Sequence, residues 1–340
     1  MAEKALAIDY SSLTPPAEIR ILTLKQGTGN DEIICDLCPV TRAESEYYAL
    51  SYEWGDESKN DPFIKVNDGE VQIRKNLFDA LKNIRKATED LQLWVDAICI
   101  NQSDVQEKSQ QVSMMGETFT KAVGVISWLG PAKDDSDLAM ALMSNTTSLQ
   151  AKLPSFDRDS RQLKSLLALC HRQYWRRVWI IQELYLAKSY VVWCGAKSIP
   201  DAEFEESLAT LNGLSSPHSS DFMHNPANHH RMARLFGSTD WINNLRRWIW
   251  VCLRGNFQCT REHDLIYALL DISEDYAKAP WSLSVDYSKT PREVFLQLLQ
   301  QRSLAKWHPG DQSRLLELAE KMNLEMDEGL RRSVSEIFGG

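Results

Sequence analysis

Two short β-like runs near the start of the chain, 18–24 (EIRILTL) and 32–38 (EIICDLC), are connected by turn-forming residues, and in the second the apolar positions Ile33, Cys35 and Leu37 alternate with the others. Strict alternation is typical of strands with one buried face, so the pattern predicts an N-terminal β-hairpin. Two later runs, 91–102 and 122–130, are apolar almost throughout, which is typical of strands buried on both faces. Before them, 73–87 has apolar residues at helical spacing. These patterns predict a sheet accompanied by helices.

The alternation of strands and helices continues along the chain. A strand is predicted at 47–56, helices at about 134–150 and 160–188, and another strand at 189–195. This order favours an α/β fold with a doubly wound, mostly parallel sheet. In such sheets ligands bind at the carboxyl ends of the strands. Polar or glycine-bearing segments begin where the apolar runs stop, so a site is expected among SYEWGD (51–56), VDAICINQ (95–102) and WLGPAKDD (128–135).

The pattern changes beyond residue 200, where helical spacing predominates. We expect an α/β core over 18–200 and a mainly helical C-terminal extension over 201–340, packed on the core. Segment 213–237 is rich in Ser, His, Asn and Pro, which predicts a loop. Its four histidines could ligate a metal, but histidines in such a loop are more often solvated, so no metal is expected.

The net charge and the spacing of the cysteines argue against nucleic acid as a partner and against a zinc site. The chain has 38 Lys and Arg against 47 Asp and Glu, a net charge of −9, and its basic residues are dispersed. Nucleic acid is therefore not expected, because phosphate backbones are bound by clustered Lys and Arg. The seven cysteines have no framework spacing, and the C-x-x-C of Cys35 and Cys38 lacks a second ligand pair for zinc. Without a signal peptide or a membrane-spanning run, a soluble cytoplasmic protein is expected.

A glutamate in the longest predicted helix is the main candidate for chemistry. Helical spacing would place Trp175, Trp179 and Glu183 on one face. A carboxylate there could act as acid or base, or stabilise the oxocarbenium charge that forms when a glycosidic bond at ribose breaks. The structural alternative is that the tryptophans anchor the core and that Glu183 pairs with Arg177 or Lys188. The sequence lacks the motifs of P-loop ATPases, kinases, α/β-hydrolases and zincins.

Several ordered motifs together resemble the fungal heterokaryon-incompatibility (HET) domain. They are YALSYEWGD (48–56), LWVDAICINQSDVQEKSQQV (93–112), VISWLG (125–130), RQYWRRVWIIQEL (172–184) and VWCG (192–195). With the flanking segments that fit the same family, the resemblance covers about 18–295. HET domains mediate self/non-self recognition and trigger regulated cell death in filamentous fungi. They are thought to be distant relatives of Toll/interleukin-receptor (TIR) domains, so the resemblance implies a TIR-like (flavodoxin-like) fold.

The resemblance also implies an activity. Enzymatic members of the TIR superfamily cleave NAD⁺ at the nicotinamide–ribose bond, which makes NAD⁺ a substrate and implies no cofactor. Glu183 occupies the position of their catalytic glutamate, on the helix that follows the third core strand. The chain has W-I-I-Q-E where the superfamily pattern is W-C-x-x-E, so it departs at the cysteine.

The same resemblance implies a set of substrate-binding residues: Ser51, Tyr52, Trp54, Asp96, Asn101, Gln102, Arg177 and Trp179. Each has a structural alternative. Asp96 could cap the following turn, and Asn101 and Gln102 could hold their loop through backbone hydrogen bonds. Trp54 could serve packing, and Arg177 could form a structural ion pair.

Two other functions are open. The first is a non-enzymatic signalling module that self-associates or docks on an upstream receptor or incompatibility partner, which a buried ion pair at Glu183 would favour. The second is an enzyme that makes a nucleotide signal from another substrate. In each case we expect a homo-oligomer on activation, and neither nucleic acid nor membrane as a partner.

Overall fold

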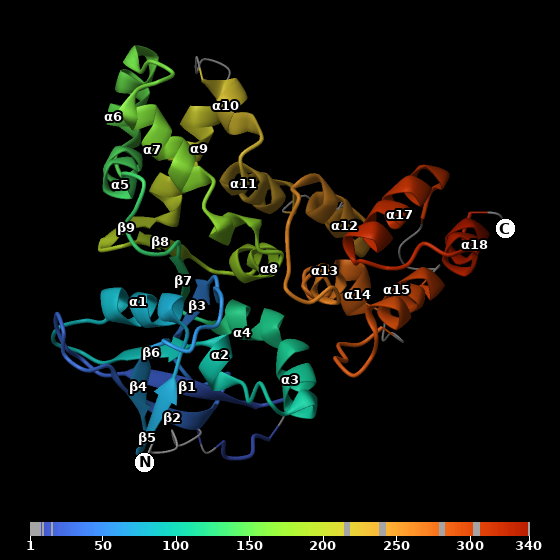
Figure 1. The fold of residues 1–340 in the computed structure, drawn as a ribbon, viewed down its shortest axis with the longest axis horizontal. Coiled ribbons are helices and arrows are strands. Elements are labelled where there is room, and N and C mark those ends of the chain that lie inside the picture. The colour runs from blue at the N-terminus through green and yellow to red at the C-terminus, as the bar shows by residue number, and fades with distance from the viewer. Residues whose placement is uncertain are drawn as a thin grey trace. The chain divides into compact units, whose positions relative to one another are not determined.

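A computed structural model of the protein describes residues 8, 10–14, 16–213, 218–237, 243–278, 283–301 and 307–338. The chain forms two compact units (Figure 1). The first unit comprises 1–102, 117–175 and 187–228, and the second comprises 103–116, 176–186 and 229–340. Each unit is thus built from segments that are separated in the sequence, whereas the sequence predicted one division after residue 200.

The first unit contains a nine-stranded sheet with the order β5-β4-β2-β1-β6-β3-β7-β8-β9. Its strands are β1 (Glu18–Leu24), β2 (Ile34–Thr41), β3 (Tyr48–Tyr52), β4 (Phe63–Val66), β5 (Gly69–Gln72), β6 (Leu91–Trp94), β7 (Gly124–Trp128), β8 (Tyr190–Cys194) and β9 (Lys197–Pro200). The predicted N-terminal hairpin is confirmed, because β1 pairs antiparallel with β2 in continuous register from Glu18 opposite Thr41 to Leu24 opposite Cys35.

The centre of the sheet is parallel. Strand β3 pairs in parallel with both β6 and β7, and β7 pairs in parallel with β8. In the sheet these parallel strands lie in the order β6, β3, β7, β8. The first of them along the chain, β3, therefore lies between the second and the third, as at the start of a flavodoxin-type doubly wound sheet. The flanks contain antiparallel pairs, β1–β2, β1–β6, β4–β5 and β8–β9, and one parallel pair, β2–β4, so the sheet as a whole is mixed.

Burial explains the apolar runs of the sequence. All five residues of β7 are buried, as expected for a central strand covered on both faces. The helices that lie within this unit are α1 (Lys75–Ile84), α2 (Asp96–Cys99), α5 (Ser136–Met143), α6 (Thr146–Lys152), η1 (Leu153–Ser155), α7 (Arg161–Cys170), α9 (Asp201–Asn212) and α10 (Ser219–Met223). Helix α1 buries the predicted stripe of Leu77, Leu81 and Ile84, and α5 and α9 contact β8 and β9.

The second unit is helical within its described residues. It contains α3 (Val105–Val112), α8 (Trp179–Tyr185), α12 (Leu245–Arg254), α13 (Asp264–Tyr267), α14 (Glu274–Lys278), α15 (Pro291–Gln300), η3 (Pro309–Asp311), α17 (Gln312–Lys321) and α18 (Glu328–Glu336). Three further helices run from one unit into the other: α4 (Met115–Lys121), η2 (Gln173–Arg176) and α11 (Pro226–Gly237). Among the described residues, no helix is both long enough and apolar enough to cross a membrane.

Two predictions about helices are wrong. Segment 213–237 was expected to be a loop, but its described part contains the helices α10 and α11. The single helix predicted over 160–188 is broken into α7, η2 and α8. As a result, Trp175 lies in the 3₁₀ turn η2 and shares no α-helix with Glu183. Only Trp179 and Glu183 keep the predicted helical spacing.

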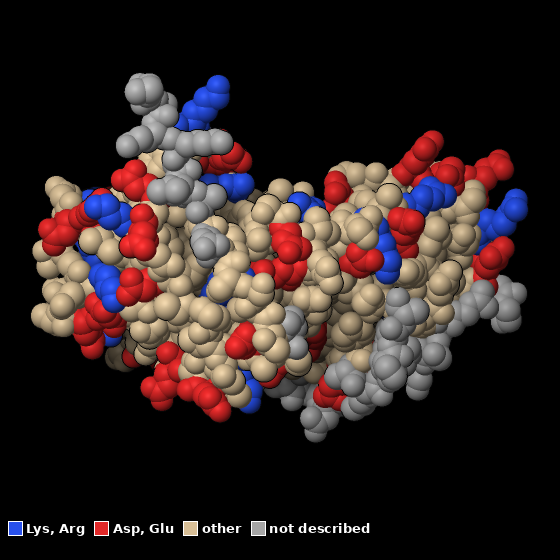
Figure 2. Space-filling model, turned by 90° about the horizontal axis from the view of Figure 1, so that it is seen from below, with Lys and Arg blue, Asp and Glu red and all other residues tan. Residues whose placement is uncertain are grey.

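On the face drawn in Figure 2, acidic and basic side chains are interspersed among uncharged ones. No continuous basic surface stands out among the described residues on that face. This distribution fits the dispersed charge that the sequence indicated.

Candidate functional site

The carboxyl ends of β3 and β6 are joined by a tryptophan and a carboxylate. Trp54, two residues after β3, donates its indole N–H to Asp96 Oδ2 at 2.9 Å. The guanidinium of Arg74 lies 5.2 Å from the centre of the Trp54 ring and donates to the carbonyl of Gly55 at 2.7 Å. An aromatic face, a cation and a carboxylate therefore meet at the strand ends, where doubly wound sheets bind ligands.

The loop after β6 is fixed by its own polar side chains. Asp96 is the first residue of the short helix α2, and its Oδ1 accepts from the backbone N–H of Ala97 at 2.7 Å. Gln102 donates its side-chain amide to the Asp96 carbonyl at 2.8 Å, which is the loop-holding role given above as the structural alternative. Asn101 lies in the same loop, half-buried. Contact of these residues with a substrate stays a prediction.

Ser51 and Tyr52 end β3 and are both buried. The Ser51 hydroxyl is hydrogen-bonded to the Tyr174 hydroxyl at 2.7 Å. Trp175, the next residue, stacks on Phe204 with ring centroids 5.2 Å apart and donates its indole N–H to the Leu169 carbonyl. Trp175 is therefore a core anchor of the first unit, as the structural alternative for the tryptophans proposed.

In the second unit, Glu183 is closed in a buried ion pair. Only 2% of the residue is exposed, and its two carboxylate oxygens accept from the two terminal nitrogens of Arg177, each at 3.2 Å. The Arg177 side chain is 17% exposed. Arg177 lies two residues before α8, so its guanidinium can fold back onto Glu183 in that helix. This two-pronged geometry is typical of a charge-assisted pair between arginine and a carboxylate.

Trp179, one turn before Glu183, has a different partner. Its side chain is hydrogen-bonded to the buried Asp264, whose pKa is raised by burial and lowered in part by hydrogen bonds from Tyr287 and Trp179. The Tyr287 hydroxyl donates to Asp264 Oδ1 at 2.7 Å. The indole N–H is thus engaged within this unit.

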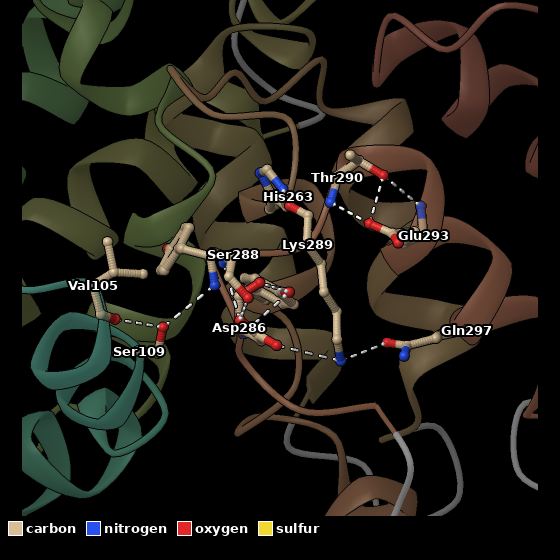
Figure 3. Close-up of polar contacts among 11 residues, drawn as sticks. Val105, Ser109, His263, Asp286, Ser288, Lys289, Thr290, Glu293 and Gln297 are labelled. Atoms are coloured by element: carbon tan, nitrogen blue, oxygen red, sulfur yellow. Dashed lines mark hydrogen bonds and ion pairs between the residues drawn. The ribbon is translucent and has the colours of Figure 1, made fainter.

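The segment that carries Tyr287 is held by the contacts drawn in Figure 3. The backbone N–H of Tyr287 donates to the hydroxyl of Ser109 on α3 at 3.3 Å, and a His263 ring nitrogen is 2.8 Å from the Lys289 carbonyl. Thr290 and Glu293 form a capping box at the start of α15. These contacts fix the position of Tyr287, which donates to Asp264, the partner of Trp179.

A second carboxylate of this unit has an unusual environment. Asp271 Oδ2 accepts from the backbone N–H of Gly116 at 2.9 Å and from the side chain of Gln182, the neighbour of Glu183, at 3.2 Å. Burial raises the pKa of Asp271 to about 6, although these two hydrogen bonds lower it. Asp271 therefore titrates close to neutral pH.

The predicted site residues fall into two groups. Ser51, Tyr52, Trp54, Asp96, Asn101 and Gln102 belong to the first unit, and Arg177, Trp179 and Glu183 belong to the second. The structure joins Trp54, Asp96 and Gln102 in the first unit, and Arg177 with Glu183 in the second. Among the described residues, no group of three or more His, Cys, Asp or Glu side chains is placed to hold a metal ion.

Some polar residues at these places were not predicted. They are Arg74, Asn76 and Arg172 in the first unit, and Asp264 and Asp271 in the second. The signal available for Asn76 was its place at the start of the helix predicted over 73–87. Asp264 and Asp271 lie far along the chain from α8, so no local pattern indicated them.

The fold and these strand-end residues define an α/β protein of the doubly wound type with a polar cluster at the carboxyl ends of its parallel strands. Residues 47–183 match the sequence model of a family described as "Heterokaryon incompatibility protein (HET)". The chain is also 29% identical over 233 residues to a Neurospora crassa protein named "Heterokaryon incompatibility protein 6, OR allele". Both findings support the resemblance to fungal HET proteins.

The matched stretch covers 54% of this chain and 34% of the Neurospora protein, so the chain spans about a third of the length of that relative. No solved structure matches the chain significantly. The family match ends at Glu183 and contains every predicted site residue.

Proposed function

We propose that the chain is a cell-death effector of fungal self/non-self recognition that cleaves NAD⁺ at the nicotinamide–ribose bond. The observation that carries the proposal is the match of residues 47–183 to the HET family, within which Glu183 is a buried carboxylate paired with Arg177. The Neurospora relative is named for heterokaryon incompatibility, which supports a role of this kind.

The proposed reaction needs one carboxylate. Water replaces nicotinamide at C1′ of the ribose, so NAD⁺ and water give nicotinamide, ADP-ribose and a proton. Nicotinamide leaves as a neutral molecule and needs no general acid, while positive charge develops on the ribose. A charged Glu183 would stabilise that charge, provided that Arg177 releases it. Within the second unit, a ring of the substrate would stack on Trp179.

The second candidate is a non-enzymatic module that acts by self-association or by docking on an upstream protein. The same ion pair favours it, because both oxygens of Glu183 are occupied by Arg177. Separating a buried pair of this kind costs about 3–5 kcal/mol. If the enzyme proposal holds, the described conformation is therefore a resting state, and homo-oligomerisation or a partner protein would supply the activating energy.

The test is a turnover measurement on the purified chain, alone and after forced oligomerisation through a fused multimerising tag. Nicotinamide and ADP-ribose, or another nucleotide product, are separated by chromatography and identified by mass. We expect Glu183→Gln to abolish nicotinamide release. Glu317→Gln, which removes an exposed carboxylate on α17, is the matched control and should keep it.

Three results would redirect the proposal. Full turnover in Glu183→Gln would exclude this carboxylate as the catalytic group. Silence of the wild-type chain in the multimerised state would favour the non-enzymatic module. A nucleotide product made from a substrate other than NAD⁺ would identify the chain as an enzyme that makes a nucleotide signal.

A further inference from the structure

Two glycines lie next to one amide side chain at the carboxyl ends of β3 and β7. Gly55 follows β3 and Gly130 follows β7, with positive φ angles of +73° and +105°. A Cβ atom added to Gly55 would meet only the Asn76 Cβ within 4 Å, at 3.9 Å. A Cβ atom added to Gly130 would lie 3.8 Å from Asn76 Oδ1 and 3.5 Å from Arg172 Nη1. The two glycines thus leave space beside polar groups.

Asn76 is held in one orientation at this place. Its Oδ1 accepts from the indole N–H of Trp128, the last residue of β7, at 2.9 Å, and its Nδ2 donates to the Glu53 carbonyl at 2.6 Å. The amide therefore ties the ends of β3 and β7 together. Strand β3 lies between β6, which follows it along the chain, and β7, which follows β6, so the direction of winding reverses here. Doubly wound sheets bind ligands at this point.

Helix α1 points its N-terminus at the same place, because Asn76 is in its first turn. Arg74, the N-cap residue, makes no side-chain cap. The backbone N–H of Lys75 donates to Asp61 Oδ1 at 3.1 Å, so it is satisfied. The Asp61 carboxylate therefore already lies at this terminus, and the N–H of Phe78 bonds the Arg74 carbonyl. The N–H groups of Asn76 and Leu77 are the ones in the first turn that could meet a further anion at the positive end of the helix dipole.

A buried guanidinium adjoins this helix terminus. Arg172 is 6% exposed, and its terminal nitrogens donate to the carbonyls of Pro131 and Lys133, each at 3.0 Å. Its Nε is buried without a hydrogen-bond partner, and no described carboxylate lies within ion-pair distance of it. Burying an arginine without a counter-charge is costly, and an anionic ligand would offset that cost.

Other buried arginines show what is particular about this one. Arg42 and Arg177 have carboxylate partners, Glu117 and Glu183. Arg85 resembles Arg172, since it also donates to two backbone carbonyls and its Nε is also buried without a hydrogen-bond partner. Arg85, however, follows the C-terminus of α1, whereas Arg172 lies against Gly130 at the end of β7. Arg172 is therefore placed where a ligand can meet both its charge and the N-terminus of α1.

We propose that Arg172, Asn76 and the first turn of α1 form a binding site for the phosphate groups of a nucleotide. The guanidinium supplies the counter-charge, the helix terminus supplies N–H donors, and the absence of side chains at Gly55 and Gly130 lets phosphate oxygens approach the backbone. The inference rests on the proposed function only for the choice of a nucleotide as the ligand. It does not involve Glu183.

The experiment uses the full chain and two probes, inorganic pyrophosphate and ADP, titrated by calorimetry and by tryptophan fluorescence. We expect both probes to bind the wild type, more weakly as salt is raised. Arg172→Gln should weaken binding by about 10-fold or more, as expected for loss of charge-assisted hydrogen bonds. Asn76→Asp keeps Arg172 but adds a negative charge, and should also weaken binding by about 10-fold or more.

Arg85→Gln is the matched control, because it removes a buried arginine with the same two-carbonyl contacts at a distant place. It should leave binding unchanged. The inference is overturned if the wild type binds neither probe at millimolar concentration, if Asn76→Asp binds as the wild type does, or if Arg85→Gln weakens binding equally. Displacement of pyrophosphate by a poly-glutamate peptide at equal concentration would overturn the preference for phosphate. Should Arg172→Gln not fold, Asn76→Asp decides.

Two results would distinguish a wrong phosphate site from a wrong NAD⁺ reaction. Binding of ADP that depends on Arg172, with no NAD⁺ cleavage in any assembly state, would leave the phosphate site standing and remove the NAD⁺ reaction. Cleavage of NAD⁺ with the same KM in Arg172→Gln and the wild type would keep the NAD⁺ reaction and remove the phosphate site.

Discussion

Replacing Arg177 by glutamine should destabilise the second unit strongly. The substitution removes the partner of both oxygens of Glu183, a carboxylate that is 2% exposed. Water cannot replace the guanidinium at such burial without opening the structure. The cost of leaving one charge of a buried pair without its partner is about 3–5 kcal/mol. For a cooperative unit of this size, that corresponds to a fall in Tm of about 10–15 °C.

The assay is urea unfolding followed by far-UV circular dichroism, with calorimetry for the Tm. The double variant Arg177→Gln/Glu183→Gln should recover most of the loss, because it removes the unpaired charge as well. Arg161→Gln is the comparison, since Arg161 pairs with Asp135 at the surface, with side chains 72% and 42% exposed. That pair should contribute less than about 1 kcal/mol.

Two results would refute this reasoning. A change below about 1 kcal/mol for Arg177→Gln would mean that solvent reaches Glu183 and that the ion pair is not buried in solution. A double variant less stable than the sum of the two single variants would mean that the side chains do not act as a charge pair.

Further predictions concern buried groups in both units. Burial raises the pKa of Asp271 from 3.8 to about 6, so the native state binds a proton that the unfolded state has released. Its stabilisation is therefore present below pH 3.8 and is lost as the pH rises through 6. Asp271→Asn should reduce the fall in unfolding free energy between pH 4 and pH 7, by about 2–3 kcal/mol at most, in urea titrations at several pH values. Gly116→Ala would place a Cβ atom 2.6 Å from the Asp271 Cβ, and should cost about 1–3 kcal/mol in the same assay, whereas an unchanged midpoint would show that the helix shifts freely. Trp175→Ala removes a fully buried ring stacked on Phe204 and should cost about 3–5 kcal/mol, and a loss below 1 kcal/mol would contradict its role as a core anchor.

Much of the sheet could be predicted from local patterns. The β-like runs EIRILTL and EIICDLC correspond to β1 and β2, and the apolar run at 122–130 contains β7 with every strand residue buried. Such patterns are readable because the spacing of apolar residues follows the geometry of each element and the number of its buried faces. The short strands β4 and β5 were not predicted, and they pair chiefly with each other at the edge of the sheet.

The helix predicted over 160–188 shows the limit of prediction from local apolar spacing. Its apolar spacing is continuous, but the chain turns at 171–178, where the backbone N–H of Val178 donates to the Gln258 carbonyl and that of Gln258 to the Arg176 carbonyl. These hydrogen bonds to a segment about eighty residues away replace helical ones. A window of sequence contains no information about such a partner.

The amino-acid sequence by itself determined that the protein has buried parallel strands, a β-hairpin at its start and polar segments at the strand ends, because burial periodicity is a local property. It also contained the motifs that resemble those of the HET domain. Only the tertiary structure decided that Glu183 is paired with Arg177, that Trp175 is a core residue, and that Arg172, Asn76 and two glycines meet beside α1. Those outcomes depend on which distant segments come together, and pairing between segments is set by the packing of the whole chain rather than by the spacing of residues along it.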